Sequence, residues 1–359
     1  MTESLPIDGR SLTLEQFLAV VRSGCSVSLT DVARSAIASS RRAVERAVGN
    51  GRPIYGVTTG FGSLSDRTIP VDQARALQLG LIRSHASGVG PALPADVVRG
   101  MILLRANSLA CGHSGVRVEL VERLLELLNR QLVPWVPETG SVGASGDLAP
   151  LAHLSLAIIG EGAFVDGSSG RAMPASEALA HEGLSPTALV EKEGVALING
   201  TSLMAAYLAL AVTDGRALLR AAEVAAAVSF DALRGSPEAL EERLAELKRS
   251  PEQREVSRAL RTLLGSSQLA GAQKEYRGQD PYTLRCIPQV LGAVELALRG
   301  AENVARQELN AVSDNPIVFE GDEFVSGGTS TASRLRTPST PSRSASNTSR
   351  RSPNVGSPA

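Results

Sequence analysis

Long helical segments without proline constrain the fold of this chain more than any other feature. Residues 203–227 and 290–312 are rich in Ala and Leu and lack the residue that most strongly breaks helices. In residues 116–132 the apolar positions recur at steps of three and four, with charged residues between them. Helices that are apolar on most faces pack inside a bundle. The sequence therefore predicts a mainly α protein with a bundle of long helices.

Capping signals predict two further helices, and loop signals predict where chemistry could lie. Ser236 and Ser250 each precede a proline, which suits the first helical turn, and they predict helices over 237–248 and 251–264. By contrast, the stretches 54–62 and 135–146 concentrate Gly, Pro, Ser and Thr and are predicted to be loops. Loops held on a rigid scaffold often carry the functional residues.

The charge is unevenly distributed along the chain. The 359 residues hold 36 Lys and Arg against 37 Asp and Glu, but residues 329–359 contain five of the Arg and no acid. Removing those five leaves 31 basic against 37 acidic residues, a charge of −6 for residues 1–328. Fourteen Ser or Thr and only two large aliphatic residues make 329–359 a predicted disordered tail. Nothing in the overall charge predicts a nucleic-acid or anionic-membrane partner.

Cysteine spacing and the N-terminus predict the compartment. Cys25, Cys111 and Cys286 are odd in number and far apart, which argues against a disulfide framework and a structural zinc site. The first residues lack the basic and apolar regions of a signal peptide, and apolar runs such as 203–212 are short for a bilayer span. We therefore expect a cytoplasmic protein that is not embedded in a membrane.

One loop carries a distinctive motif, because residues 143–151 read Gly-Ala-Ser-Gly-Asp-Leu-Ala-Pro-Leu. Alone, Ala-Ser-Gly would be an ordinary turn in which Ser145 or Asp147 caps the following helix. The whole nonapeptide, however, resembles the signature of the histidine and aromatic amino-acid ammonia-lyase family. The resemblance implies that Ala144, Ser145 and Gly146 cyclise into the prosthetic group 4-methylidene-imidazol-5-one (MIO).

The residue types of this loop suit that cyclisation. The unhindered backbone nitrogen of Gly146 would attack the carbonyl carbon of Ala144, and dehydration would turn the Ser145 side chain into a methylidene. The resemblance implies that an amino-acid substrate adds to this electrophile, which makes its nitrogen a better leaving group. A base then removes the β-proton to leave an α,β-unsaturated acid. No external cofactor, nucleotide or metal is expected.

Three other segments match the same family. Residues 55–62, Tyr-Gly-Val-Thr-Thr-Gly-Phe-Gly, resemble its mobile N-terminal loop, which implies that Tyr55 is the catalytic base; otherwise Tyr55 is a packed loop aromatic. Asn199 matches an asparagine near the electrophile and the substrate, and its alternative role is a turn or cap residue. In a third segment, residues 279–285, the resemblance implies that Arg285 binds the substrate carboxylate as a bidentate ion pair. Gln279 and Tyr282 would complete the polar side of the substrate site.

The substrate is predicted from the position that resembles the family's selectivity site. His85 stands there, as is typical of the histidine branch, where it can hydrogen-bond an imidazole; a core histidine is the alternative. The tripeptide 202–204, Ser-Leu-Met, instead resembles phenylalanine and tyrosine enzymes or the related aminomutases. Histidine is therefore the expected substrate, with an aromatic ammonia-lyase or aminomutase as the alternative.

The resemblance breaks after Gly328. The family pattern would continue Asn-Phe-His-Gly-Glu-Pro, whereas residues 329–334 read Thr-Ser-Thr-Ala-Ser-Arg. Shifting plausible codons of the expected six residues by one base produces the observed six. The sequence therefore predicts a single-base frameshift near codon 328; a genuine regulatory tail would explain the composition but not this coincidence.

The resemblance also implies an architecture and an assembly. Residues 1–200 would form an N-terminal domain with the electrophile loop, 201–328 a truncated bundle of the fumarase/aspartase-like type, and 329–359 the tail. Family members are homotetramers whose sites draw on three chains. A truncated bundle would leave apolar helix faces such as that of 290–312 without partners. An inactive, truncated remnant is therefore the non-enzymatic alternative.

Overall fold

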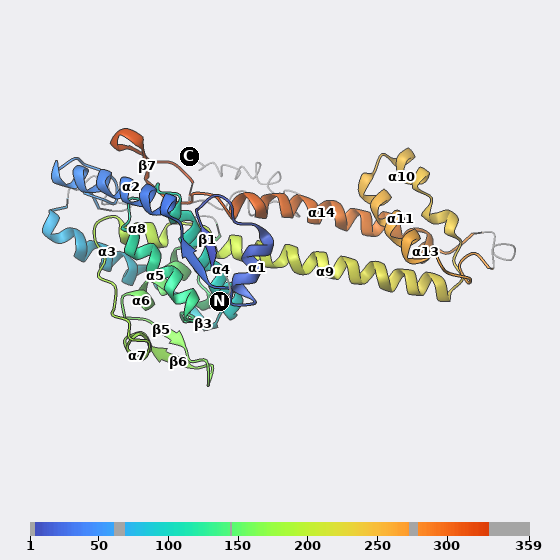
Figure 1. Cartoon of the computed structure of the whole chain (residues 1–359), viewed down its shortest axis with the longest axis horizontal. Coiled ribbons are helices and arrows are strands. Elements are labelled where there is room, and N and C mark those ends of the chain that lie inside the picture. The colour runs from blue at the N-terminus through green and yellow to red at the C-terminus, as the bar shows by residue number, and fades with distance from the viewer. Residues whose placement is uncertain (1–3, 61–68, 144–145, 273–278, 330–359) are drawn as a thin grey trace, which may run out of the picture.

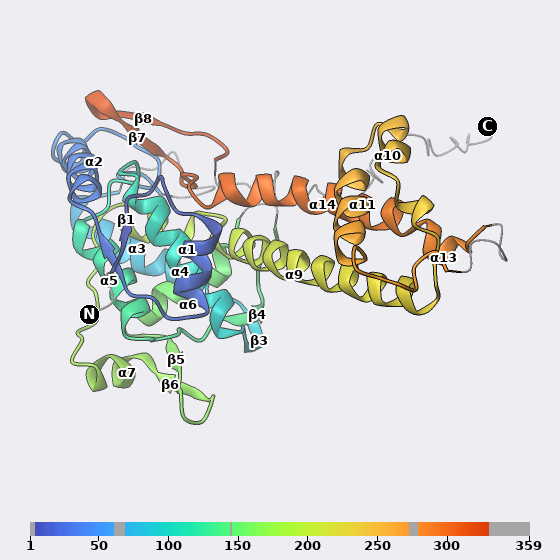
Figure 2. The ribbon, with the colours of Figure 1, turned by 45° about the vertical axis from the view of Figure 1, so that its right-hand side comes forward.

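Two long helices set the shape of the molecule, as Figure 1 shows for the computed structural model. The structure describes residues 4–60, 69–143, 146–272 and 279–329, without the side chains of residues 71 and 72. The helices are α1 (Leu14–Val21), α2 (Asp31–Gly49), α3 (Val71–His85), α4 (Ala95–Ala110), α5 (Val118–Asn129), α6 (Leu148–Ile158), α7 (Ala175–His181), α8 (Glu193–Ile198), α9 (Ser202–Ala232), α10 (Glu242–Lys248), α11 (Pro251–Leu263), α13 (Tyr282–Arg285) and α14 (Ile287–Glu308). Helices α1 to α8 form a body, from which α9 and α14 extend side by side as a rod that ends in α10, α11 and α13 (Figures 1 and 2).

Strands are short and always paired in twos within the described residues. They are β1 (Leu5–Ile7), β2 (Val27–Leu29), β3 (Val89–Ala92), β4 (Pro137–Thr139), β5 (Ala163–Val165), β6 (Ala172–Pro174), β7 (Ile317–Phe319) and β8 (Glu323–Val325). The β1 and β2 pair is parallel and the other three pairs are antiparallel. One strand corrects the sequence analysis, because β4 lies in the stretch 135–146 that is predicted to be a loop throughout.

Most predicted helices are confirmed, and one is wrong. α5 and α11 fall within the predicted segments, and Ser250 caps α11 by accepting a hydrogen bond from the backbone N–H of Gln253. The segment 237–248, however, is a 3₁₀ turn (Pro237–Leu240) followed by α10, with extended backbone at Glu241 between them. The predicted cap fails there, because Ser236 forms no side-chain capping bond. Without that cap, proline alone does not hold the first turn in the α conformation.

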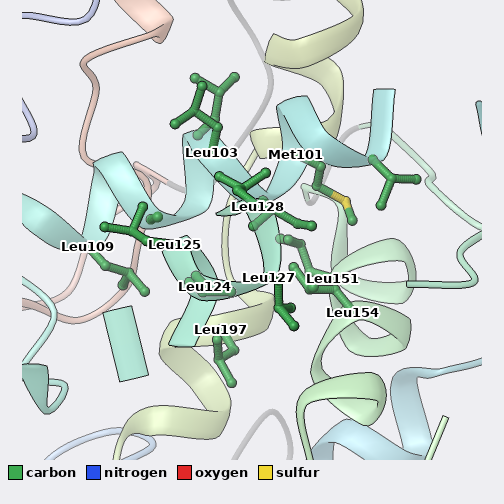
Figure 3. Packing of buried hydrophobic residues seen from close by; sticks show 14 of the residues in the cluster. Met101, Leu103, Leu109, Leu124, Leu125, Leu127, Leu128, Leu151, Leu154 and Leu197 are labelled. Atoms are coloured by element: carbon green, nitrogen blue, oxygen red, sulfur yellow. The ribbon is translucent and has the colours of Figure 1, made fainter. Parts of the chain in front are cut away.

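The core of the body forms around α4 (Figure 3), whose residues from Val97 to Ala110 are almost all buried. The apolar face of α5 and the first turns of α9 pack against α4, and the apolar residues of α6 belong to the same cluster. Gly100 lets the rod join this core, because a Cβ there would lie 2.9 Å from both Ala206 and Phe17. The body and the start of α9 therefore share one hydrophobic core.

A second junction brings distant parts of the chain together. The Asn310 amide, just after α14, bonds the backbone of Leu12 in both directions at 2.9 Å. The Asn107 amide donates to the carbonyl of Leu309 at 2.8 Å. The segment that returns from the rod thus completes the N-terminal part of the body.

The rod leaves apolar side chains exposed. Leu218 and Val228 on α9 are 72% and 64% exposed, and Val290 on α14 is 61% exposed. In the described residues, one stretch, Glu193–Ala232, which comprises α8, the turn after it and α9, is long and apolar enough to cross a membrane by length and composition alone. Inside the protein, however, 72% of its most apolar window is buried, as in the core helix of a globular protein.

Candidate active site

The predicted electrophile loop is anchored on both sides. Ala144 and Ser145 lie outside the described residues, and Gly143 and Gly146 flank them with φ angles of +69° and +84°. Such angles are easily adopted only by residues without a side chain. The backbone N–H of Asp147, the next residue, donates to the carbonyl of Gly200 at 2.8 Å. The loop is thereby tied to the turn that precedes α9.

The Asp147 side chain ties the same loop to α9. It is fully buried, and one carboxylate oxygen accepts from the backbone N–H groups of Leu203 at 2.8 Å and Met204 at 3.0 Å. The other oxygen accepts from the Ser141 hydroxyl at 2.9 Å. Burial raises the pKa of Asp147, and these three hydrogen bonds act against that rise. Asp147 therefore caps α9 instead of α6, the helix that it directly precedes.

Asn199 lies at the other side of this junction and is more than a turn residue. Its side-chain Nδ2 donates to the carbonyl of Asn315 at 3.0 Å and lies 3.4 Å from a carboxylate oxygen of Asp314. Its own carbonyl accepts from Arg105 at 3.3 Å. The next residue must be Gly200, because a Cβ there would lie 2.1 Å from the Arg105 guanidinium.

Beneath Asn199 lies a buried charge cluster that the sequence analysis does not identify. Lys192 and Asp314 form an ion pair at 2.7 Å with no exposed side-chain surface, and Arg105 is fully buried beside them. Burial lowers the pKa values of Lys192 and Arg105, and the Asp314 charge opposes both shifts. One signal was available in the sequence: Arg105 stands in the otherwise apolar run 101–106, where a charge requires a partner.

The Tyr55 loop packs on the same side of the body. Tyr55 is half-buried in a turn, in which the backbone N–H of Ile54 donates to the Thr58 hydroxyl at 2.8 Å. Ile54 and Val57 share an apolar cluster with Val318 of β7, the strand that follows Asn315. The turn therefore packs against the segment that holds Asn199. Residues 61 and 62 of the predicted loop lie outside the described residues.

His85 is the last residue of α3, and its ring already has a partner on one side. Its Nδ1 lies 2.8 Å from the carbonyl oxygen of Leu81 and 3.1 Å from the Ser84 hydroxyl. A proton on Nδ1 satisfies the carbonyl and leaves Nε2 as a hydrogen-bond acceptor. The loop after α3 is held by His153 of α6, whose Nε2 accepts from the backbone N–H of Gly88 at 3.1 Å.

Three predicted site residues lie far from the others. Gln279 is exposed, Tyr282 is 71% exposed, and the Arg285 guanidinium stacks 3.9 Å from the Tyr282 ring centroid. Leu284, between them, packs with Phe230 near the end of α9. At 1.5 Å per residue, that point is about 40 Å from the start of α9. Helix α13, which carries Tyr282 and Arg285, accordingly lies at the far end of the rod from α6, the helix that follows Asp147 (Figure 1).

The remaining reactive groups form no further centre in the described residues. Cys25, Cys111 and Cys286 are free thiols, and no three His, Cys, Asp or Glu side chains gather as a metal site would require. Burial raises the pKa of Cys111 to about 11, so this thiol stays protonated. A hollow of about 530 Å³ lies along the rod beside Arg216 and Arg306, away from every predicted site residue.

Comparison with known proteins identifies the family of this chain. The family model described as aromatic amino acid lyase matches residues 12–337. The chain belongs to the aromatic amino acid lyase family. Among curated members of this family, the histidine ammonia-lyase of Symbiobacterium thermophilum is 48% identical over 89% of this chain and 63% of its own length. The histidine ammonia-lyase of Deinococcus radiodurans is 50% identical over 89% and 61%.

Solved structures of aromatic amino acid lyases and related enzymes confirm the mainly helical fold. A tyrosine aminomutase from Streptomyces globisporus matches with a TM-score of 0.87 at 34% identity, over 93% of this chain and 66% of that one. Histidine ammonia-lyase from Trypanosoma cruzi matches with a TM-score of 0.83 at 35% identity, over 93% and 62%. The chain thus spans under two thirds of the length of the curated relatives named above.

Proposed function

We propose that this chain carries the electrophile-forming part of a histidine ammonia-lyase, a carbon–nitrogen lyase that eliminates ammonia from L-histidine to give trans-urocanate. The observation that carries the proposal is the anchored loop. Asp147, the residue after Gly146, donates its backbone N–H to the Gly200 carbonyl and accepts a hydrogen bond from the first turn of α9 through its side chain. The similarity to curated histidine ammonia-lyases supports the choice of histidine. His85 supports it as well, because its Nε2 can accept the N–H of a substrate imidazole.

The residues around the loop fit the MIO group that the family uses. A tight ring needs a nitrogen without steric hindrance and a backbone that can turn sharply, and Gly146 meets both needs because it has no side chain and adopts a positive φ. Closing the ring and dehydrating Ser145 would release two water molecules and require no other reactant. Once formed, the group supplies an electrophile that assists the departure of ammonia. The chain's own task is to hold both ends of the loop, through Asp147 on one side and the Gly143 turn on the other.

The other residues have distinct roles in this proposal. Tyr55 acts as the base that takes the β-proton, and Asn199 faces the substrate beside the loop. Arg285 binds the substrate carboxylate, with Gln279 and Tyr282 beside it. Because these last three lie about 40 Å from the start of α9, they serve a site of a neighbouring copy. The proposal therefore includes the family's homotetramer, an amino-acid substrate, and a cytoplasmic location without nucleic-acid or membrane partners.

Specific observations favour two alternatives to a histidine ammonia-lyase. The tripeptide 202–204 and the 0.87 TM-score with a tyrosine aminomutase favour an aromatic ammonia-lyase or aminomutase. The exposed apolar side chains of α9 and α14 would be covered in a homotetramer, and a truncated chain that does not assemble would leave them in water and aggregate, which is the inactive-remnant alternative. The frameshift near codon 328 stays a prediction, and independent sequencing of that codon tests it.

The test is turnover by the purified chain. Histidine, phenylalanine and tyrosine are supplied separately, and the unsaturated acid and ammonia are measured. Release of urocanate from histidine is expected, and activity on phenylalanine alone would exclude histidine as the substrate. Ser145→Ala should abolish turnover and retain the mass of both water molecules, whereas Ser169→Ala, in the exposed turn between β5 and β6, should still form the ring. Size-exclusion chromatography shows whether the chain assembles.

A further inference from the structure

A single buried carboxylate contacts both a lysine and the predicted site asparagine. Asp314 accepts from the Lys192 ammonium at 2.7 Å through Oδ2, and its Oδ1 lies 3.4 Å from Nδ2 of Asn199. Neither charged side chain has exposed surface. The pair connects α8, which ends at the asparagine, to the segment returning from the rod.

These contacts fix which way the Asn199 amide points. Its Nδ2 faces two acceptors, the Asp314 carboxylate and the carbonyl of Asn315 at 3.0 Å. Only the NH₂ group can donate, so turning the amide over would place its oxygen against a negative charge. The Oδ1 atom therefore points away from the pair, and in the described part of the chain it accepts no hydrogen bond.

The charge balance indicates that the pair serves more than stability. Arg105 and Lys192 are two buried cations beside the one carboxylate of Asp314. Removing charges from water is costly, and well-packed apolar residues often stabilise a core as well as a buried ion pair does. A buried pair that touches a predicted site residue is better explained by orientation of that residue.

We propose that Asp314, neutralised by Lys192, is a positioning residue that holds the Asn199 carbonyl oxygen toward the substrate. An oxygen presented in this way accepts a hydrogen bond, and the ammonium group is the donor that every amino acid carries. The assignment of Asn199 to a substrate site rests on the proposed function. The orientation of its amide rests only on the contacts within this chain.

Two double variants separate orientation from stability. Asp314→Asn alone would leave two buried cations, Lys192 and Arg105, without their carboxylate and can fail to fold for that reason. Both double variants leave Arg105 in the same state, so the difference between them isolates the acceptor. Lys192→Met combined with Asp314→Leu removes both charges and the acceptor. Lys192→Met combined with Asp314→Asn removes both charges and keeps an acceptor oxygen. Arg117→Met with Glu193→Gln is the matched control, because it neutralises a neighbouring ion pair at 2.7 Å whose glutamate is also fully buried.

The first readout does not depend on turnover. In the full chain labelled with ¹⁵N-asparagine, the side-chain NH₂ signal of Asn199 is assigned by its loss in Asn199→Asp. Its hydrogen exchange should be roughly tenfold faster in the leucine double variant, as expected for losing one hydrogen bond. Exchange should stay slow in the asparagine double variant and in the Arg117 control. Equal exchange in the leucine and asparagine variants would overturn the proposal.

The second readout is ligand binding, measured by titration with histidine and with 3-(imidazolyl)propionate, which lacks the amino group. The leucine double variant should weaken histidine binding roughly tenfold and leave the analogue unchanged, and the asparagine variant should restore histidine binding. Equal weakening of both ligands would refute the ammonium contact. If the amide responds as expected but the wild-type chain converts no amino acid, the proposed function fails and the positioning role stands. If the wild type is active and the Asn199 amide does not respond, the positioning role of Asp314 fails and the proposed function stands.

Discussion

The two ends of α9 hold different halves of the predicted site and are built differently. At the first end, Asp147 is fully buried and Asn199 is fixed by hydrogen bonds from three directions. At the other end, Tyr282 is 71% exposed and Arg285 rests on its ring. A buried polar group must be paired inside its own chain, whereas an exposed one is free to meet another molecule. In the proposed site, the residues at the first end are therefore held within this chain, and those at the other end are presented outward.

The largest effect should come from the buried pair at the first end. Lys192→Met would remove the ion-pair partner bonded to the buried Asp314 carboxylate and leave the Arg105 charge beside it, which costs up to about 3–5 kcal/mol in unfolding free energy. Urea denaturation of both proteins measures this difference. Arg22→Met is the control, because its pair with Asp214 is exposed and should contribute less than about 1 kcal/mol. Equal losses in the two variants would show that the first end is no more tightly built than the surface.

The next effect concerns the anchor of the loop. Asp147→Ala removes the cap of α9, and the expected loss is about 2 kcal/mol, at the upper end for capping residues because the site is buried. Ring formation should fall with it, measured as the fraction of chains that have lost two water molecules. Asp147→Asn keeps an acceptor oxygen and should retain part of the stability and part of the ring formation. Full ring formation in the alanine variant would mean that the anchor does not shape the loop.

A smaller effect depends on pH and involves His153. Burial lowers its pKa from the usual 6.5, so the unfolded chain binds the proton more readily than the folded one. Stability should therefore rise with pH up to about 6.5 and fall as pH drops below it, because the ionised ring loses its bond from Gly88. Thermal denaturation at a series of pH values measures this change, and the melting temperature should rise as pH increases toward 6.5. His153→Gln should flatten this part of the profile; an unchanged slope would assign it to another group.

The smallest effect on stability is expected at the far end. Arg285→Met removes a contact with an exposed ring and should change the unfolding free energy by less than about 1 kcal/mol. If its proposed role in a neighbouring copy is right, the same variant should lose carboxylate binding. Mixing it with a Tyr55→Phe chain should then restore part of the activity, because some assembled sites receive both intact residues. Destabilisation as large as that of Lys192→Met would remove the contrast between the two ends.

Local signals in the sequence predict much of the fold. The three- and four-residue periodicity of 116–132 and the serine before Pro251 predict α5 and α11, because both signals act within a few residues. The break at Glu241 escapes the same reasoning, since it depends on a cap that Ser236 does not form. Ends of the long helices are likewise set by packing: α14 stops at Glu308, where the return segment begins to contact Asn107.

The candidate site is predictable only in part, for a similar reason. The sequence suggests Asp147 only as a possible cap of the helix that follows it, whereas its carboxylate reaches 56 residues along the chain to cap α9. The Lys192–Asp314 pair spans 122 residues, a separation over which periodicity and capping carry no information. The distance of Arg285 from the loop is equally invisible until the length of α9 is known.

The reciprocal hydrogen bonds between Leu12 and Asn310 can form only late in synthesis, because their two residues lie near opposite ends of the described chain. A ribosome makes the body first and the rod second, yet the body receives its last partners only when the chain has travelled out along α9 and back along α14. Until then Lys192 has been synthesised and Asp314 has not. In the nascent chain, Lys192 therefore has no Asp314 partner until more than a hundred further residues have been synthesised. A chaperone that binds early should act during this interval, and a pause in translation after α9 should lengthen it.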